Sequence, residues 1–448
     1  MGEQIFIPEY IQALLACLEA AGHTGYLVGG CVRDALMGRV PTDYDIAVDA
    51  TPDVLPGCFP GYTVLPTGIA YGTVTVLADG HPVEVTCFRR EGAYRDGRHP
   101  DEVRYCATIE EDLSRRDFTV NAMAYRPDTG LCDPFGGAAD LAKKQLSCVG
   151  DANERFSEDA LRILRAMRFC AVLGLRPDPE LLNAANRQSL LLREISVERV
   201  LAEMKKMLCG ENIAWVLSRF AVPLCAVIPE MGLAVGFDQK NPHHIYTVYD
   251  HIAVTVASCP PDPILRLTML LHDIAKPYVM TEDAEGVRHF RGHQDRGAEM
   301  ARDILTRLRC DRKTIEKVCT LIRFHDLRPA PERGALHRYV IEVGGYENAL
   351  LLTHVRRADL SAQAPAYHFQ FPGIDAAEQM LRQMQEAGAP ADVSGLAVNG
   401  ADLIALGVPT GPRIGSLLSE LLAAVAAGQV ENTRAALTQH IRETAGIL

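Results

Sequence analysis

The distribution of apolar and polar residues divides the chain into a mixed first part and a helical remainder. Residues 10–22 have apolar side chains at helical spacing, and the apolar run GYLV that follows ends at two glycines. Short β-type runs recur at 44–48, 73–77 and 83–88, separated by turn sequences such as ADGHP. We therefore expect residues 1–150 to form a small mixed sheet with helices.

From about residue 152 the apolar positions recur at helical spacing and few β-type runs remain, as in NERFSEDALRILRAMRFCAVLGL. Proline-rich breaks such as CPPDP and RPAPERG separate the helical stretches and mark joints between bundles. The fold class predicted is α+β. It comprises a mixed head over 1–150, a helical neck over 151–235, a helical domain over 236–365 and a helical C-terminal region over 366–448.

Composition narrows the class of protein. The chain has 448 residues, 48% of them hydrophobic, and a net charge of −12, so a nucleic-acid partner needs a local basic surface. Thirteen cysteines without a CxxC pair favour neither a zinc ribbon nor a disulfide framework, and they predict a cytoplasmic protein. No apolar run reaches transmembrane length and the first twenty residues lack a signal-peptide pattern, which predicts no membrane partner.

The segment GGCVRDALMGRVPTDYDIAV, residues 29–48, begins with two glycines between a predicted strand and a predicted helix. Gly29 and Gly30 allow a ligand to approach the backbone closely, and the helix start offers free N–H groups. Arg33 falls within the first helical turn, where it can add a charge-assisted contact. This pattern predicts a phosphate-binding turn in a βαβ-like setting.

Two carboxylates follow in the same segment. Asp43 and Asp45 are two residues apart, so on a strand they project to one face and can hold one or two Mg²⁺ ions. Acids on an apolar strand are costly unless a metal pairs them, and such ions assist nucleotidyl transfer. The alternative is a tight turn with two acids on an edge strand. Glu84, on a later strand, is either a third catalytic carboxylate or a surface residue.

Four long motifs occur in order. Residues 29–45 match GGxVRDxLLGRxPxDxD with Met37 at one Leu position, and RRDFTVNAMAY, residues 115–125, is followed by DPFGGAADLAKKQL. EDALRILRAMRF occupies 158–169, and SVERVLAEMKKML occupies 196–208. Together they resemble the class II nucleotidyltransferases with a polymerase-beta-type head, the family of tRNA CCA-adding enzymes and bacterial poly(A) polymerases.

The resemblance implies specific roles in the head. Gly30 and Arg33 would hold the incoming triphosphate, and Arg116 a phosphate or sugar. Asp43 and Asp45 would be the catalytic ligands of Mg²⁺.

The resemblance also implies that Asp159 and Arg162 present a Watson–Crick-like edge to the incoming base. With Arg165 and Arg168 they recur at every third position, so on one helix each side chain would step back by about 60°. Neighbours would share a face, which lets the first two read a base while Arg165 and Arg168 contact triphosphate or RNA backbone. The alternative is a solvated charge stripe.

Two further segments bear on the substrate. REGAYRDGRHPDEVRY, residues 90–105, corresponds to a loop that CCA-adding enzymes need for the terminal A, although an ordinary surface loop would have the same composition. Lys205, Lys206 and the C-terminal helical region are candidate tRNA contacts, and a solvated mixed surface is the alternative.

A second constellation lies downstream. The adjacent His-Asp pair in the apolar helical stretch LRLTMLLHDIAKP is unusual unless both residues bind a metal. The order of residues resembles the HD phosphohydrolase superfamily. The ligands of an unidentified divalent metal would be His251, His272, Asp273 and Asp359. His293 and His325 occupy positions where two-metal members add ligands, and His244 competes for the first position. The alternative is a set of hydrogen-bonded core histidines.

These features together predict an enzyme that adds C, C and A to the 3′ end of tRNA without a template. CTP and ATP would be the substrates, pyrophosphate the product, and an HD phosphohydrolase activity an addition. One alternative is a poly(A) polymerase, although the nearly neutral C-terminus lacks the basic extension usual in that group. The other is an HD phosphohydrolase with an inactive transferase head.

Overall fold

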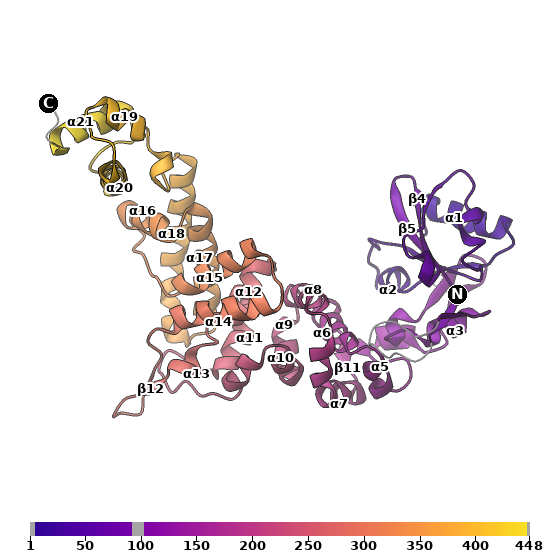
Figure 1. Ribbon diagram of the computed structural model, residues 1–448. Coiled ribbons are helices and arrows are strands. Elements are labelled where there is room, and N and C mark those ends of the chain that lie inside the picture. Colours follow the sequence, from indigo (N-terminus) through magenta and orange to yellow (C-terminus); the bar gives the residue numbers. More distant parts are fainter. Residues whose placement is uncertain (1–4, 92–102, 446–448) are drawn as a thin grey trace. The chain divides into compact units, whose positions relative to one another are not determined.

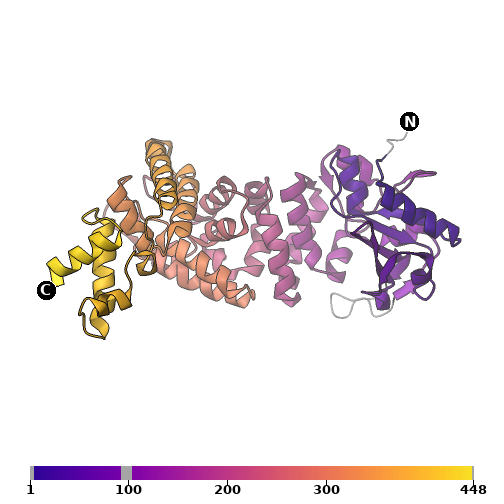
Figure 2. The same ribbon diagram turned by 90° about the horizontal axis from the view of Figure 1, so that it is seen from above.

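The computed structural model describes residues 5–91 and 103–445, which fold as two compact units (Figure 1). Unit 1 comprises Met1–Asn212 and Arg219–Val227, and unit 2 comprises Ile213–Ser218 and Ile228–Leu448. Figures 1 and 2 show almost all strands in the indigo-to-violet part of the chain and helices from there on, as predicted. The finer division into four domains stays a prediction.

A seven-stranded sheet forms the framework of the head, in the order β3-β4-β5-β2-β1-β8-β9. Its strands are β3 (Thr63–Leu65), β4 (Thr73–Ala78), β5 (His81–Cys87), β2 (Asp45–Val48), β1 (Gly25–Val28), β8 (Ala124–Arg126) and β9 (Gly130–Cys132). The β2–β5 pair is parallel and the other described neighbours in this sheet are antiparallel.

The expected βαβ-like setting of the two glycines is therefore wrong. Helix α2 (Gly30–Leu36) joins β1 to β2, but these strands are antiparallel neighbours, with Val28 opposite Asp45. Because α2 has only two turns, about 10 Å of helix, it does not carry the chain back past the start of β1. The chain instead enters β2 at the end where β1 stops, and this brings the glycine turn and Asp45 to the same edge.

Both faces of the sheet are covered. Alternate residues of β2 illustrate this, because Ile46 and Val48 belong to the apolar cluster under α1 (Glu9–Ala20), whereas Ala47 belongs to the cluster beside α3 (Ile109–Ser114). A strand buried on both faces reads as a continuous apolar run, as IAV does here. The acids at its start therefore lie at the end of a fully packed element.

The rest of unit 1 is mainly helical. Its helices are α4 (Gly137–Ala142), α5 (Ala152–Glu158), α6 (Leu161–Leu173), α7 (Pro179–Arg187), α8 (Val197–Leu208) and α10 (Ala221–Val227), and a small parallel pair joins β10 (Gln145–Leu146) to β11 (Arg176–Pro177). Residues 92–102 of the predicted A-addition loop lie outside the described residues. The segments that flank them, β6 (Arg89–Glu91) and β7 (Val103–Tyr105), pair antiparallel.

Unit 2 is helical apart from the short pair β12 (Thr281–Glu282) and β13 (Arg288–His289). Its helices are α9 (Ile213–Arg219), α11 (Val248–Ser258), α12 (Pro263–Leu271), α13 (Lys276–Val279), α14 (His293–Arg307), α15 (Arg312–Phe324), α16 (Arg333–Glu342), α17 (Tyr346–Ser361), α18 (Phe371–Glu386), α19 (Gly400–Ala405), α20 (Pro412–Ala426) and α21 (Arg434–Ala445). Helix α17 packs against α11, α12, α15 and α18. In the part of the chain that is described, no helix has the length and apolarity to cross a membrane.

Candidate functional site

The predicted catalytic acids share one side of the head. Tyr44 is buried while Asp43 and Asp45 on either side of it are exposed, so the two acids project the same way although β2 begins only at Asp45. In the parallel β2–β5 pair, Asp45 is in register with Glu84. Three carboxylates therefore converge, which favours the reading of Glu84 as part of the site.

Electrostatics at this position match a cation site. Desolvation, followed by the neighbouring Glu84 carboxylate, raises the pKa of Asp45 to about 6, and Arg116 opposes this only in part. Oxygen donors whose charges repel one another are the environment that Mg²⁺ prefers. Asp43, Asp45 and Glu84 therefore fit a divalent cation.

The glycine turn is backed by a buried ion-pair network. Gly29 adopts a φ of 73°, and a Cβ there would lie 3.0 Å from Arg116 Nη1, so the turn and the arginine are in close contact. Arg116 Nη2 donates to Asp112 Oδ2 at 3.1 Å, and Arg115 Nη2 donates to Asp112 Oδ1 at 2.7 Å. Asp112 is fully buried, so it fixes both arginines of the RRDFT motif.

A second buried acid links the head to the neck. Asp117 accepts from Arg165 Nε at 2.7 Å and from Asn121 Nδ2 at 3.1 Å. Asn121 Oδ1 in turn accepts from Arg33 Nη1 at 2.7 Å. Arg33 and Arg165 also lie over the ring of Phe169, at 5.3 and 5.6 Å from its centroid. The predicted triphosphate ligands from the head and the neck thus meet at one aromatic residue.

Arg168 joins the same group. Its guanidinium carbon lies 4.3 Å from the Phe169 centroid, and its Nε forms an ion pair with Glu203 Oε2 at 2.6 Å. Glu203 lies on α8, within the fourth sequence motif. The structure therefore brings together three of the predicted arginines, Arg33, Arg165 and Arg168, around Phe169.

Asp159 and the three neck arginines do not share one helix as predicted. Helix α5 ends at Glu158 and α6 begins at Leu161, and Asp159 between them is extended, with φ −145° and ψ 103°. The cause is local, because Asp159 Oδ1 accepts from the Leu161 N–H, as a residue at the start of a helix does. The step of about 60° between successive charged side chains therefore applies only to Arg162, Arg165 and Arg168, which all lie on α6.

In this structure Asp159 and Arg162 have other partners than each other. Asp159 Oδ2 accepts from Arg199 Nη2 at 2.9 Å. Arg162 Nη1 donates to Glu158 Oε2 and to the Arg155 carbonyl, the latter at 3.1 Å. Arg162 is buried. Each residue of the predicted base-reading pair is thus held by a second charged side chain.

Several functional candidates were not predicted from the sequence: Asp112, Asp117, Asn121, Glu158 and Arg199. All lie inside or beside motifs that were recognised. Asn121 is the polar residue in RRDFTVNAMA, Glu158 precedes Asp159, and Arg199 belongs to SVERVLAEMKKML. The available signal was a charged or amide side chain in an otherwise apolar motif, which requires a buried partner.

In unit 2 the predicted metal ligands converge in a second site. We call it the histidine–aspartate cluster. Its members are His251, His272, Asp273, His293, His325 and Asp359, all of them buried. Two groups of potential ligand atoms lie within 4.8 Å of one another, His251 with His272 and Asp273, and Asp273 with His293 and His325. Asp273 belongs to both groups, as a carboxylate that bridges two cations does.

The histidine orientations are set by helix ends. The His-Asp pair follows the end of α12 rather than lying inside it, and His325 follows α15. His272 Nδ1 lies 2.8 Å from the Met269 carbonyl, and His325 Nδ1 lies 2.6 Å from the Ile322 carbonyl, which also accepts from the His325 N–H. Both carbonyls belong to the last turn of a helix. An Nδ1 that faces a carbonyl carries the proton, so each Nε2 presents its lone pair to the cluster.

The aspartates complete the donor set. Asp359 Oδ2 accepts from Gln363 Nε2 at 2.7 Å and from Arg356, while its Oδ1 lies 3.1 Å from His251 Nε2. Among the described atoms, neither oxygen of Asp273 receives a well-aligned hydrogen bond, although Lys276 Nζ forms an ion pair at 2.7 Å. Buried carboxylate oxygens and imidazole nitrogens that lack well-aligned hydrogen bonds fit a site for a divalent cation.

The pKa shifts of Asp273 and His293 favour the forms that bind metal, whereas the pKa of His272 is raised, because the Asp273 carboxylate outweighs the effect of burial. Burial would raise the pKa of Asp273, but His272 and Lys276 outweigh it and hold that pKa well below its usual range. Burial lowers the pKa of His293 to about 4. Burial and Lys276 also lower the pKa of His244 to about 3, and its Nε2 lies 3.4 Å from Lys276 Nζ. His244 therefore contacts the lysine, while His251 contacts both aspartates.

The geometry of unit 1, with acids at the start of a central strand beside a glycine turn and an arginine group, defines a metal-dependent nucleotidyltransferase. Family comparisons agree, since the family described as Poly A polymerase head domain matches residues 25–147. The family described as tRNA nucleotidyltransferase domain 2 matches residues 294–441.

Whole-chain relatives identify the family. The CCA-adding enzyme of Levilactobacillus brevis is 32% identical over 445 residues, covering 97% of this chain and 98% of the relative. That of Geobacillus stearothermophilus is 33% identical, covering 95% of both. The crystal structure of the Bacillus stearothermophilus CCA-adding enzyme in complex with CTP aligns with a TM-score of 0.73 and 29% identity, over 98% of both chains. The chain belongs to the CCA-adding enzyme family and is a nucleotidyltransferase.

A more distant solved structure shares the fold. The Thermotoga maritima CCA-adding enzyme, solved in complex with tRNA, aligns with a TM-score of 0.58 at 19% identity, over 98% of this chain and 97% of the other. At that identity the likeness concerns the fold alone.

The raised pKa of Asp45 leads to a pH-dependent prediction. A carboxyl whose pKa rises from 3.8 to about 6 on folding contributes stability below about pH 4 that is lost as the pH rises through about 6. In EDTA, Asp45→Asn should therefore raise the unfolding temperature clearly at pH 7 and by much less at pH 4.5, where most of the folded protein carries a protonated Asp45. Thermal unfolding of both proteins at each pH measures this.

Two controls define the result. Mg²⁺ at pH 7 should reduce the advantage of Asp45→Asn, because the cation compensates the carboxylates of the natural protein. Glu9→Gln, at an exposed position of α1, neutralises a charge outside the site. A stabilisation by Asp45→Asn that is the same at both pH values would contradict the assignment.

Proposed function

We propose that this chain adds C, C and A to the 3′ end of tRNA, using CTP and ATP and releasing pyrophosphate. The observation that carries the proposal is a head whose carboxylates lie beside the glycine turn and Arg116, together with the arginine group that head and neck form around Phe169. Family membership supports it, because the relatives are named for this reaction. We further propose that it acts in the cytoplasm, where its thirteen free cysteines would stay reduced.

Asp43 and Asp45 would hold Mg²⁺, with Glu84 beside them. When bound, the ion supplies positive charge that activates the attacking 3′-hydroxyl and stabilises departing pyrophosphate. The side chains of Arg33, Arg165 and Arg168 would hold the triphosphate in line for attack on its α-phosphate. Their contacts with Asp117, Asn121 and Glu203 support this role, because a guanidinium fixed in advance loses less freedom on binding.

Asp159 and Arg162 would select the base. Their donors and acceptors match the edge of a nucleobase, and Arg199 and Glu158 hold them when no nucleotide is bound. Arg162 would then exchange the Glu158 carboxylate for the base. Gly30 and Arg116 would contact phosphate or sugar, as the motifs imply.

We also propose that the histidine–aspartate cluster binds one or two divalent cations and hydrolyses a phosphate ester. Three histidines whose Nδ1 atoms face carbonyls, together with a bridging Asp273, support metal binding. Lys276 and Arg356 add positive charge that favours a phosphate. Contact with tRNA through Lys205, Lys206 and the C-terminal region remains a further part of the proposal.

Product length tests the transfer reaction. Purified protein, Mg²⁺ and a tRNA transcript lacking CCA would be supplied with CTP, ATP or both, and products resolved at single nucleotides. We expect three added nucleotides with both substrates. Asp45→Ala should abolish all incorporation, because the cation loses a ligand, whereas Asp53→Ala, an exposed acid of the same head, should not. Long A tails without CTP would instead indicate a poly(A) polymerase.

Base choice tests the role of Arg162. A bidentate contact to a base contributes about 1–3 kcal/mol of discrimination, so Arg162→Ala should lower CTP-over-UTP selectivity at least about fivefold. Triphosphate affinity should change less, because Arg33, Arg165 and Arg168 remain. Arg187→Ala, an exposed arginine of the neck, is the matched control. Unchanged selectivity in a folded Arg162→Ala protein would remove Arg162 from base recognition.

Metal content tests the second site separately. After incubation with Mn²⁺ and dialysis, bound metal would be counted by mass spectrometry. Asp273→Ala should lower the metal content, since Asp273 belongs to both ligand groups. CCA addition should persist in this variant. His440→Ala, in α21 outside the cluster, is the control, and an unchanged metal content in Asp273→Ala would contradict the assignment.

A further inference from the structure

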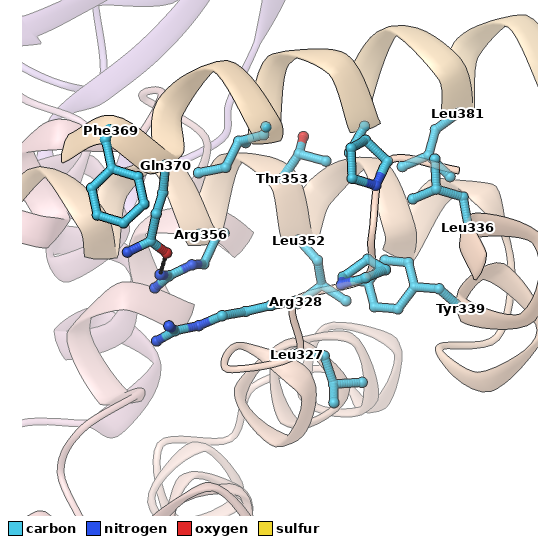
Figure 3. Close-up of a pocket in the computed structure, with 15 residues that line it drawn as sticks. Leu327, Arg328, Leu336, Tyr339, Leu352, Thr353, Arg356, Phe369, Gln370 and Leu381 are labelled. Atoms are coloured by element: carbon cyan, nitrogen blue, oxygen red, sulfur yellow. Dashed lines mark hydrogen bonds between the residues drawn. The ribbon is translucent and has the colours of Figure 1, made fainter. Parts of the chain in front are cut away.

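A largely apolar cavity lies in unit 2, beside the histidine–aspartate cluster. It has a volume of about 280 Å³, is open to solvent on one side, and is lined by α16, α17, α18 and the segment that follows α15 (Figure 3). Leu336, Leu352 and Leu381 line it and are at most 2% exposed. A cavity walled by buried leucines favours an apolar occupant.

One end of this cavity is positively charged. Figure 3 shows the side chains of Arg328 and Arg356 extending to the same end, where Phe369 and Gln370 also lie. Arg356 Nη2 donates to Gln370 Oε1 at 3.0 Å, and its other nitrogen donates to Asp359. Arg328 is exposed and, among the described residues, has no ion-pair partner. The carboxylates Asp359 and Asp326 lie near Arg356, so Arg328 is the guanidinium left available to an anion.

Arg328 connects the cavity to the cluster. It lines both the apolar cavity and a polar cavity of about 340 Å³, whose lining includes Asp273, His293, His325 and Asp359. Arg356 bonds directly to Asp359. The charged end of the apolar cavity is therefore the end next to the cluster.

We propose that the apolar cavity binds the organic group of a phosphate monoester whose phosphate lies between Arg328 and the histidine–aspartate cluster. The inference rests on the metal centre proposed above and names its substrate class, an ester of a single-ring aromatic or compact apolar alcohol. The leucine walls fit such a group, and Arg328 fits the phosphate. Phe369, which is 75% exposed at the rim, would gain a ring to pack against.

Size and polarity favour this class over others. About 280 Å³ accommodates one ring system but no strand of RNA or peptide. A sugar would leave hydroxyl groups unpaired against Leu336, Leu352 and Leu381, which is unfavourable. In the hydrolysis that follows from the site, a water oxygen bonds to phosphorus and the phosphorus–oxygen ester bond breaks. The proton passes to the departing alcohol, so the products are the free alcohol and inorganic phosphate.

Binding of stable analogues tests the inference without requiring turnover. The full chain, loaded with Mn²⁺, would be titrated with phenylphosphonate, methylphosphonate and phenol by calorimetry. Burial of a phenyl ring should make phenylphosphonate bind at least about tenfold more tightly than methylphosphonate. Arg328→Gln should weaken both phosphonates and leave phenol unaffected. Equal affinity for the two phosphonates, or for phenol and phenylphosphonate, would overturn the proposal.

A matched pair of glycine variants isolates the cavity. Gly373 lines it from α18, and a Cβ there would meet no atom within 4 Å, so Gly373→Leu starts a side chain at the cavity wall without a backbone clash and is designed to occupy the space. It should abolish the preference for phenylphosphonate and preserve methylphosphonate affinity and metal content. Gly415→Leu makes the same change at an open position of α20 and should have no effect. A preference that survives in Gly373→Leu would overturn the assignment.

Failure of the metal centre gives a different result. If the natural protein binds no Mn²⁺, the proposed centre fails. Comparing phenylphosphonate with methylphosphonate in the metal-free protein then tests whether the cavity binds an organic group, since Arg328 and the leucine walls do not depend on the ion. A phenylphosphonate preference there would support the cavity as a binding site, and its absence would overturn both.

Discussion

The transferase site depends on the compensation of one buried carboxylate, Asp117. Its two oxygens accept from Arg165 of the neck and from Asn121 of the head, and Asn121 holds Arg33. Burial would raise the pKa of Asp117, yet Arg165 and Asn121 hold that pKa below its usual value, so the carboxylate stays ionised. Removing one partner of such a buried pair costs about 3–5 kcal/mol, which ties the two structural elements together. The same bonds orient the arginines to which we assign the triphosphate.

The charges in unit 2 are arranged on a different principle. Around Asp117, each carboxylate oxygen is hydrogen-bonded by a side chain, and the site is complete as a protein structure. Around Asp273, by contrast, lone pairs converge while neither oxygen is well hydrogen-bonded, and helix-end carbonyls fix the surrounding imidazoles. The first arrangement positions the chain's own arginine side chains. The second suits metal cations that bind from solution.

The sequence was sufficient to predict what depends on local chemistry. The mixed head and the helical remainder follow from residue types at fixed spacing. The side shared by Asp43 and Asp45 follows from their two-residue separation, whereas the members of the histidine–aspartate cluster came from a resemblance in the order of residues along the chain. The antiparallel course of β1 and β2 could not be predicted in this way, because it depends on the length of α2 rather than on its composition. The pairing of Asp159 with Arg199 was likewise hidden, since the two residues are forty positions apart and meet only through the packing of α6 on α8.

The break between α5 and α6 determines which charged partners Asp159 and Arg162 have. Three-residue spacing of charges favours one continuous helix, but Asp159 bonds the Leu161 N–H and thereby starts a new helix. Because Asp159 leaves the helical path, its remaining oxygen points to Arg199, and Glu158 at the end of α5 can reach Arg162 in the first turn of α6. A continuous helix would place Asp159 and Arg162 on one face as a simple ion pair that neutralises itself. The break instead gives each residue a separate counter-charge, and in the base-selecting role proposed above this would keep both available to a base as it binds.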